Sequence, residues 1–292
     1  MSTYRIAYFG GEPLGAPILQ SLIEAGYNPE LIVCNPDRPA GRGRKLTPPP
    51  VKVVATEHNL SLWQPEDIPT DLETVEARPL HSDWDLFIVV AYNKILPDWL
   101  ITLPKHGTIN VHPSLLPKLR GASPIRSAIL QNEPEHVGVS IMQMDSQMDH
   151  GPILAQTPSP IAASDWPPAG PALDAALIEL GGQLLLQTLP NYLDGSLTLT
   201  EQDHAAATYC TRLKKDMAEL AIDPYNLPTG EAALAAYRTI QAFAGIGDAW
   251  FVYEGTRYKI KTAHLEGEQL IIDTVVPAGK KEMSFKTILT MR

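Results

Sequence analysis

The sequence predicts an α/β fold, with a doubly wound and mostly parallel sheet, followed by a small antiparallel β-barrel. Short apolar runs alternate with stretches of helical periodicity over the first two thirds of the chain, which is typical of a parallel sheet covered by helices on both faces. Beyond residue 245, strand-like segments instead follow one another at hairpin distances. A length of 292 residues is long for a single core, which also favours two domains.

The strands of the first domain are predicted where apolar residues run together between turn residues. They are expected at 4–10, 30–34, 85–92, 107–112 and 137–144. Helices are predicted at 14–26, 48–59, 123–131 and 171–189, with a short one through Trp99 and Leu100. The helix over 48–59 has proline in its first turn, where the missing N–H would have no partner in any case. This alternation predicts a Rossmann-like domain.

The character of the chain changes near residue 195. We expect a catalytic domain over 1–195, a polar linker over 196–207 and a second domain over 208–292. One helical pattern covers 231–244. The segments AWFVYEG, TRYKIKTAHLEG and EQLIIDTVV then have the composition of strands separated by turns, which predicts a small antiparallel barrel.

Composition argues against several classes of protein. Apolar runs such as 85–92 are too short to cross a bilayer, and the N-terminus shows no basic segment or signal-type cleavage site. Cys34 and Cys210 form no metal or redox motif, which indicates a reducing compartment. A formal net charge of −10 argues against a large nonspecific polyanion-binding surface, although it leaves room for a local basic patch. We therefore expect a cytoplasmic protein with no membrane partner.

Residues that could carry chemistry gather in the stretch INVHPSLLPKLRGASPI, 109–125. Positions two apart on a strand face the same side, so Asn110 and His112 project together at the carboxyl end of their strand, where open α/β sheets place ligands. An isolated Asn-x-His is more often an ordinary strand end. Here, however, the following strand is succeeded by a turn that carries Asp149 two residues before Gly151. If the two strands are neighbours, an amide, an imidazole and a carboxylate converge.

These three groups are suited to moving an acyl group onto an amine. The imidazole can donate to a developing oxyanion or shuttle a proton, the amide is a fixed donor, and the carboxylate orients and charges the imidazole. No Ser or Cys stands in a context typical of a nucleophile, which favours direct transfer over an acyl-enzyme. We expect Asp145, in the same turn, to be structural because no Gly-Pro turn follows it.

The combined pattern resembles the folate-dependent formyltransferases. INVHPSLLPKLRGASPI followed by MQMDSQMDHGPILAQ has that family's Asn-x-His, Ser-Leu-Leu-Pro, Arg-Gly-x-x-Pro and Asp-x-Gly elements, with His150 where the family has a small residue. The resemblance implies that Asn110, His112 and Asp149 are catalytic, that 10-formyltetrahydrofolate is the formyl donor, and that no metal takes part. It also implies a folate pocket formed by Val89, Val90, Ala91, Tyr92, Asn93, Ser114, Leu115, Leu116 and Pro117.

The loop CNPDRPAGRGRKLTPPPVK, 34–52, resembles the insertion after the second strand of methionyl-tRNA formyltransferases. In that family the insertion reaches the acceptor stem, and Arg42 falls on its key arginine. The cations are dense for an acidic chain, and flanking glycines let the backbone approach a phosphate groove. They are Arg38, Arg42, Arg44 and Lys45. A solvated basic turn is the alternative reading of such a cluster.

The closing segment VVPAGKKEMSFKTIL resembles the end of that family's OB-like C-terminal barrel, which implies a tRNA-binding second domain. Together these resemblances imply formyl transfer from 10-formyltetrahydrofolate to initiator methionyl-tRNA by a monomeric cytoplasmic enzyme of bacterial type. Three alternatives stay open. A formyltransferase for a nucleotide-linked amino sugar would share the three catalytic residues without needing the loop or the barrel. The others are a catalytically idle RNA-binding relative and a hydrolase that deformylates the folate.

Overall fold

The computed structural model describes residues 4–11, 14–41 and 43–290, and it divides into two compact units. Unit 1 comprises Met1–Arg120, Gly138–Ser159 and Ala176–Thr208. Unit 2 comprises Gly121–Val137, Pro160–Ala175 and Tyr209–Arg292. These units group segments by compactness and not by chain order. The domain boundaries expected near residues 195 and 208 therefore stay a prediction.

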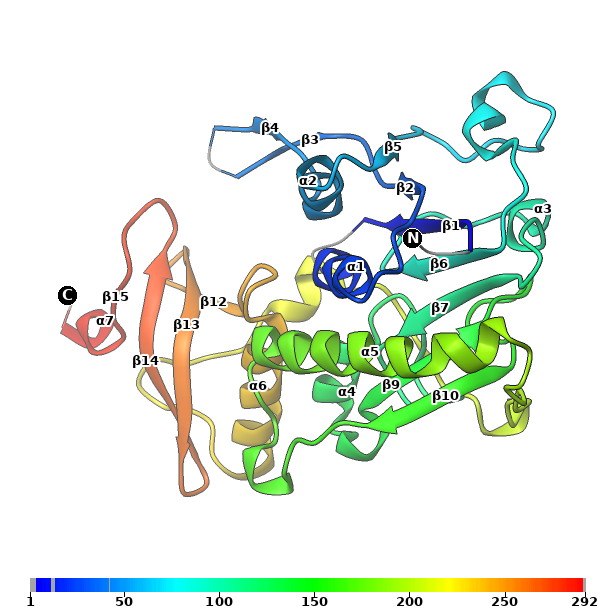
Figure 1. The fold of residues 1–292 in the computed structure, drawn as a ribbon. Helices are drawn as coiled ribbons and strands as arrows, with labels where there is room; N and C mark the ends of the chain where they lie inside the picture. The colour runs from blue at the N-terminus through cyan, green and yellow to red at the C-terminus, as the bar shows by residue number, and fades with distance from the viewer. Residues whose placement is uncertain (1–3, 12–13, 42, 291–292) are drawn as a thin grey trace. The chain divides into compact units, whose positions relative to one another are not determined.

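A seven-stranded sheet forms the centre of unit 1, with the strand order β10-β9-β7-β6-β1-β2-β5 (Figure 1). The strands are β1 Ile6–Gly10, β2 Leu31–Val33, β5 Ser61–Trp63, β6 Leu86–Val90, β7 Thr108–His112, β9 Gly138–Gln143 and β10 Ile153–Pro158. The strands from β5 to β7 in this order are all parallel, which confirms the predicted mostly parallel sheet. β9 runs antiparallel to β7, and β10 runs antiparallel to β9.

The helices lie where the apolar periodicity predicts them. They are α1 Gly15–Glu24, α2 Pro50–Glu57, α3 Asp98–Ile101, α4 Pro124–Gln131, α5 Gly170–Leu193 and α6 Gly230–Phe243. Short 3₁₀ helices cover Val75–Leu80, Pro134–His136, Ala163–Asp165, His204–Ala206 and Lys215–Ala218. Across the described parts of the chain, no helix is both long and apolar enough to cross a membrane.

Helix α5 covers the face of β7 that is opposite to the predicted catalytic residues. A side chain at Gly181 would place its Cβ only 3.1 Å from the Val111 side chain, so glycine lets the helix lie close to the strand. Val111 is buried there, while Asn110 and His112 alternate to the other face. One face of β7 therefore packs against α5, and the other face carries the predicted catalytic residues.

An aromatic cluster fixes the core beneath β1 and β6. The rings of Phe9 and Phe87 lie 5.2 Å apart, and that of Tyr92 lies 5.7 Å from Phe9. Trp84 stacks edge-on against Phe87 at 5.7 Å. These side chains are buried, and such ring pairs stabilise a core beyond their buried area alone. Packing here holds the carboxyl ends of β1 and β6 in place.

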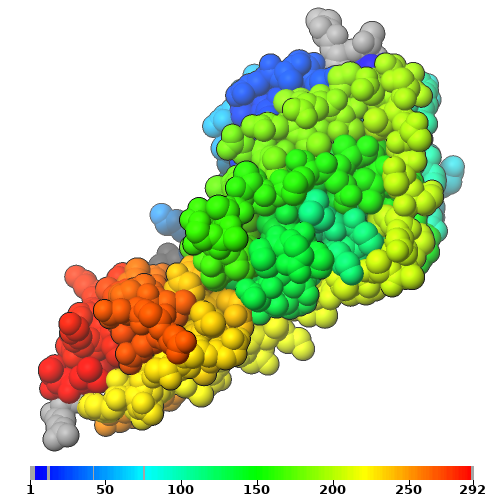
Figure 2. Space-filling model, turned by 90° about the horizontal axis from the view of Figure 1, so that it is seen from below, coloured from blue at the N-terminus to red at the C-terminus, as the bar shows by residue number. Residues whose placement is uncertain are grey.

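Unit 2 contains a four-stranded antiparallel sheet in the order β12-β13-β14-β15. The strands are β12 Trp250–Tyr253, β13 Thr256–Glu266, β14 Gln269–Pro277 and β15 Met283–Ser284, followed by helix α7 Lys286–Thr290. Helix α6 packs against β13 and β14 with a face that includes Ala233 and Ile240. Atoms of these strands, orange to red in Figure 2, lie at the surface of unit 2. The predicted antiparallel strands at the end of the chain are thus confirmed.

Four short strands complete the structure. They are β3 Arg38–Ala40, β4 Lys45–Thr47, β8 Arg120–Gly121 and β11 Tyr209–Cys210. β3 and β4 pair antiparallel, so the basic loop is a small hairpin. The sequence did not predict this hairpin, because its residues are exposed and show no apolar alternation.

We expect Phe87→Ala to lower the free energy of unfolding by about 3–5 kcal/mol, because it leaves a cavity among buried aromatic rings. Urea denaturation followed by circular dichroism measures the change. Leu46→Ala is the matched control: Leu46 is 68% exposed, so its truncation should alter stability by no more than about 0.5 kcal/mol. Equal effects of the two substitutions would contradict the role of this cluster.

Candidate active site

Strand β7 positions the first two site residues. It lies between β6 and β9, where Asn110 pairs with Val89 on one side and Met142 on the other. His112 is 4% exposed, and Asn110 is half-buried. Because β7 is hydrogen-bonded to a strand on each side, its backbone cannot shift without breaking those bonds. The Asn110 and His112 side chains therefore start from a fixed backbone position.

The structure brings the three predicted catalytic side chains together. Asn110 donates a hydrogen bond from Nδ2 to Asp149 Oδ1 at 3.4 Å, and His112 Nδ1 lies 3.6 Å from the same oxygen. The Asp149 side chain is 14% exposed. One carboxylate oxygen thus faces both an amide and an imidazole in a largely desolvated place, where such charges interact strongly.

A turn returns Asp149 to β7. Because β9 is antiparallel to β7, its last residue Gln143 lies opposite Ile109, near the start of β7. The chain then turns through 144–152, and Gln143 N donates to Pro152 O at 2.9 Å as β10 begins. A Cβ at Gly151 would lie 2.1 Å from the Gln143 carbonyl oxygen, so this turn accepts only glycine there.

The hydrogen bonds of His112 determine which ring nitrogen faces the site. Nε2 lies 3.1 Å from the carbonyl oxygen of Leu119, which can only accept, so Nε2 carries a proton and donates it. In the neutral ring Nδ1 is therefore the unprotonated nitrogen, directed at Asp149. It can take up a proton there, and in the protonated ring it can donate to a carboxylate or to an oxyanion.

Three residues other than glycine hold left-handed backbone around this site. They are Ala91 at φ 50°, Leu119 at φ 58° and Asp149 at φ 50°. Each such residue costs roughly 1–2 kcal/mol, and strain of this kind collects at functional sites. Ala91 follows β6, Leu119 supplies the acceptor for His112, and Asp149 carries the carboxylate. The surrounding structure must therefore determine these conformations.

The predicted folate residues form two groups. In the first, Val89, Val90 and Tyr92 are buried, Ala91 is half-buried and Asn93 is exposed. Burial raises the pKa of the Tyr92 hydroxyl, and its oxygen has no hydrogen-bond partner within the part of the chain that the structure describes. An unpaired buried hydroxyl in this segment is compatible with a ligand that has both polar and apolar groups.

The second group is held by a polar network from β9 and β10. Ser140 Oγ donates to Ser114 O at 2.6 Å and accepts from Leu116 N at 3.0 Å. Gln156 Nε2 donates to Leu116 O at 2.8 Å. Ser114 is fully buried and its hydroxyl donates to Lys118 O at 2.6 Å. Ser114 and Leu116 therefore fix the segment, while Leu115 and Pro117 are half-buried.

Three of the predicted tRNA-binding cations lie on the β3–β4 hairpin in the described part of the chain. Arg38, Arg44 and Lys45 are exposed, and Arg42 falls outside the described residues. Arg38 Nη2 forms an ion pair with Glu66 Oε2 at 2.6 Å. At the base of the hairpin, a hydrogen bond from Gln64 and then one from Lys52 lower the pKa of the Asp37 carboxyl. These bonds anchor the loop to the sheet.

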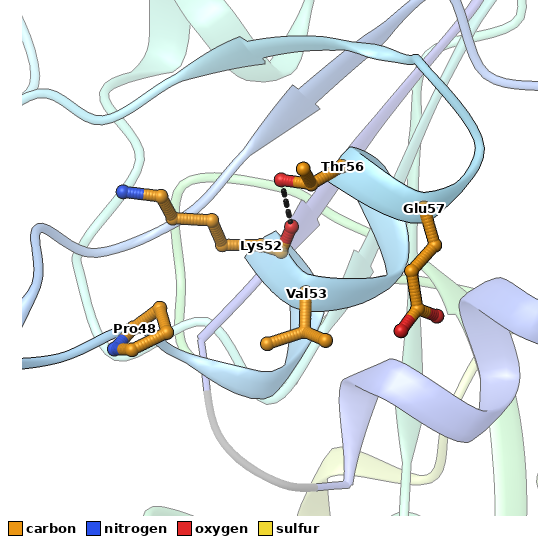
Figure 3. Close-up of a pocket in the computed structure, with 5 residues that line it drawn as sticks. All are labelled: Pro48, Lys52, Val53, Thr56 and Glu57. Atoms are coloured by element: carbon orange, nitrogen blue, oxygen red, sulfur yellow. Dashed lines mark hydrogen bonds between the residues drawn. The ribbon is translucent and has the colours of Figure 1, made fainter.

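A shallow pocket of about 350 Å³ lies on α2, just after the hairpin (Figure 3). Pro48, Lys52, Val53, Thr56 and Glu57 line it. Thr56 donates to the Lys52 carbonyl at 2.8 Å, a bond within the helix. None of the predicted catalytic or folate residues lines this pocket.

His150 and Asp145 contact each other instead of crowding the carboxylate of Asp149, which is predicted to be catalytic. His150 Nδ1 lies 2.6 Å from Asp145 Oδ2, and the His150 ring stacks flat on His204 at 3.9 Å. Asp145 also accepts from Gln147 N at 2.8 Å. These contacts agree with the expectation that Asp145 is structural, although its role stays a prediction.

Two residues near the site had no predicted role. Arg120 is 1% exposed and Gln202 is 5% exposed, and the two side chains bond to each other. Arg120 belongs to the Arg-Gly-x-x-Pro element, whereas Gln202 lies in the stretch expected to be a linker. The sequence does not indicate a role for Gln202, because a single glutamine in a polar stretch has the pattern of a solvent-exposed residue.

Comparison with known proteins identifies the family of the chain. The model of the formyl transferase family matches residues 4–188. The chain therefore belongs to the formyl transferase family. Methionyl-tRNA formyltransferase from Halorhodospira halophila is 41% identical, over 84% of this chain and 74% of its own length. The enzyme of the same name from Enterococcus faecalis is 34% identical, over 98% and 95% of the two chains.

Solved structures share the fold. The N-formyltransferase from Helicobacter canadensis, in complex with folinic acid and dTDP-3-aminofucose, superposes with a TM-score of 0.64 at 15% identity. The match covers 92% of this chain and 99% of that one. At this identity the similarity establishes the fold, a Rossmann-like domain with further elements, and leaves the acceptor to be argued from the chain itself.

Cys34 gives a test of the core beside the site. Burial raises the pKa of its thiol to about 11, an effect that Lys52 partly opposes. The raised pKa means that the folded protein favours the neutral thiol. The stability that the neutral thiol allows is therefore fully present below the ordinary thiol pKa of about 8.5, and it is lost as pH rises through the folded pKa of about 11. We expect iodoacetamide at pH 9 to spare Cys34 in the native protein and to label it in urea. Rapid native labelling, measured by mass spectrometry, would contradict the burial.

Proposed function

We propose that the chain transfers the formyl group of 10-formyltetrahydrofolate to the amino group of initiator methionyl-tRNA, giving N-formylmethionyl-tRNA for translation initiation. The observation that carries this proposal is that the Asn110 amide and the His112 imidazole both face one carboxylate oxygen of Asp149. Membership of the formyl transferase family supports the reaction, and the names of relatives at 34–41% identity support the acceptor.

The proposed mechanism assigns one task to each side chain. Bound 10-formyltetrahydrofolate supplies the formyl carbon that the amine attacks. Asn110 has two N–H groups, of which one bonds to Asp149, so the second can donate to the tetrahedral oxyanion. His112 reaches the same oxygen through Nδ1 because Nε2 is held by Leu119. Asp149, directly or through water, helps remove the amine proton as the new C–N bond forms.

Collapse of the tetrahedral species breaks the bond between the formyl carbon and the folate nitrogen. The departing nitrogen takes a proton from the protonated His112, and the proton that Asp149 removed from the amine then passes to His112 Nδ1, which restores both groups. Proton number is thus conserved: one leaves the attacking amine and one joins the leaving amine. We propose that the folate lies along Val89–Asn93 and Ser114–Pro117, at the carboxyl ends of β6 and β7 where such sheets bind ligands.

The acceptor is proposed to be held by the hairpin cations and by the C-terminal unit. β13 carries Arg257, Lys259 and Lys261 at alternate positions, and the Arg257 guanidinium lies 5.6 Å from the Trp250 ring. Cations beside an aromatic ring are suited to a phosphate backbone. We further propose that the enzyme acts as a monomer in a bacterial cytoplasm.

The proposed function is tested by incubating the purified chain with 10-formyltetrahydrofolate and three separate acceptors: charged initiator tRNA, amino sugar nucleotides, and water. We expect N-formylmethionine on the tRNA, identified by mass spectrometry after release. Formylation of the amino sugar nucleotide alone would show that this sugar, and not the tRNA, is the acceptor. Formate release alone would indicate a hydrolase, and no reaction with any acceptor would indicate an idle RNA-binding relative.

Asp149→Asn should lower turnover by roughly two to three orders of magnitude, since the amide keeps the shape but loses the charge that stabilises a cationic imidazole. Asp145→Asn is the matched control in the same turn, and we expect a much smaller loss. Steady-state kinetics with methionyl-tRNA measure both. A larger loss for Asp145→Asn would move the catalytic carboxylate to that residue.

Arg42→Ala and Arg44→Ala should each raise KM for methionyl-tRNA and leave folate binding unchanged. Each lost phosphate contact should lower the slope of log affinity against log salt by about 0.7–0.9. Arg38→Ala should have a smaller effect, because Glu66 already pairs with that guanidinium. Titrations of initiator tRNA at several salt concentrations measure the slopes. Curves that match the wild type for Arg42→Ala and Arg44→Ala would remove the hairpin from the tRNA-binding surface.

A further inference from the structure

A buried arginine lies behind the turn that carries Asp149. The Arg120 side chain is almost fully enclosed, at 1% exposure. Its Nε and Nη2 donate to Gln202 Oε1 at 3.2 and 2.6 Å. A guanidinium is costly to bury unless its donors are used, and a charge-assisted bond of this length is a strong one. The two side chains come from positions 82 residues apart.

This arginine fixes the orientation of the Gln202 amide. A guanidinium carries only donors, so the amide must present its oxygen to Arg120 and its NH₂ group to the other side. There Nε2 donates to Asp149 O at 3.0 Å and to Gly151 O at 2.7 Å. Both N–H groups are therefore used, and Oε1 accepts two bonds. The amide has one satisfied orientation.

The two carbonyls that it binds belong to the strained part of the turn. Asp149 holds φ at 50°, and Gly151 fits directly against the Gln143 carbonyl. The carbonyl of Asp149 and its side chain leave the same Cα. Holding that carbonyl therefore restrains the Cα–Cβ bond from which the carboxylate reaches Asn110 and His112.

The same arginine also reaches the beginning of the turn. Arg120 Nη2 lies 3.0 Å from His204 Nδ1, which accepts because the guanidinium can only donate. The His204 ring stacks on His150 at 3.9 Å, and His150 bonds to Asp145 at 2.6 Å. Arg120 is thus connected to the turn at two places: through Gln202 to Asp149 and Gly151, and through His204 and His150 to Asp145.

We propose that Gln202, held by Arg120, is a positioning residue that aims the Asp149 carboxylate at His112 and Asn110. Gln202 bonds to the backbone of the turn and not to the carboxylate itself. The inference rests on the proposed function only for the reaction that Asp149 serves, because the contacts themselves exist whatever the acceptor. It adds two residues to the site, one of them in the stretch that the sequence predicts to be a linker.

The first test compares Gln202→Glu and Gln202→Met. A glutamate can still accept from Arg120, but its second oxygen would face the carbonyl oxygens of Asp149 and Gly151 and cannot donate to them. A methionine keeps the length of the side chain and loses all of these hydrogen bonds. We expect kcat to fall about 10–100-fold in both, the typical loss for residues behind a catalytic group. KM for methionyl-tRNA and for the folate should stay within about twofold, since no binding contact is removed. Gln183→Glu, an exposed amide-to-acid change on α5, should leave kcat unchanged.

A double-mutant cycle separates positioning from a general structural role. If Gln202 acts through Asp149, then Gln202→Met should cause little further loss of kcat in an Asp149→Asn background. Losses that multiply would show that Gln202 acts elsewhere, and they would overturn the proposal. An unchanged kcat in both Gln202 variants would overturn it as well.

A readout that needs no reaction keeps this inference distinct from the proposed function. Hydrogen–deuterium exchange of the 144–152 peptide should quicken in Gln202→Met, while the β1 and β6 peptides keep wild-type rates. If the wild type formylated no acceptor but this local change appeared, the function would fail and the positioning contact would stand. Wild-type exchange of 144–152 in the variant, or a rise spread over all of unit 1, would overturn the positioning role.

Discussion

The return of one turn onto strand β7 is the constraint on which this site depends. Asn110 and His112 need only the two-residue period of a strand to share a face. Their carboxylate partner, 39 residues further along the chain from Asn110, must be brought back from the far end of β9. The antiparallel pair β9–β10, the close fit of Gly151 and the left-handed backbone of Asp149 all meet that one requirement. Changes in any of them act on the distance between a carboxylate and an imidazole.

Much of the fold follows from periodicity alone. The runs around Phe9 and Phe87 are continuously apolar, as strands buried on both faces must be, and helices such as α1 and α6 show one apolar side. The direction of β9 could not be predicted, because a buried strand has the same pattern whether its neighbour is parallel or antiparallel. β10 also escaped prediction. It lies at the edge of the sheet, its first two residues are both buried, its last four alternate between half-buried and exposed, and it ends in a proline.

The sequence brought together, as candidates for one site, residues that are close in sequence or belong to a recognisable pattern. Asn110 and His112 are two positions apart on one strand, and Asp149 stands in a turn with its glycine. Arg120 and Gln202 could not be paired in this way. Their partnership depends on a contact across 82 positions, and neither residue type is unusual in its local context. A single sequence records that Gln202 is polar, but it does not record that the side chain is enclosed and fully bonded.

The same contacts explain why direct transfer suits this site better than a covalent intermediate. Ser114 is the hydroxyl nearest in sequence to His112, yet it is fully buried and donates its proton to Lys118 O at 2.6 Å. The Ser140 hydroxyl is committed to the Ser114 carbonyl. Cys34 is held protonated at neutral pH, since burial raises its pKa to about 11, and a thiol rather than a thiolate is a poor nucleophile. His112 meanwhile directs Nδ1 at a carboxylate and not at a hydroxyl, which is the arrangement needed to manage a proton and an oxyanion while the acceptor amine itself attacks.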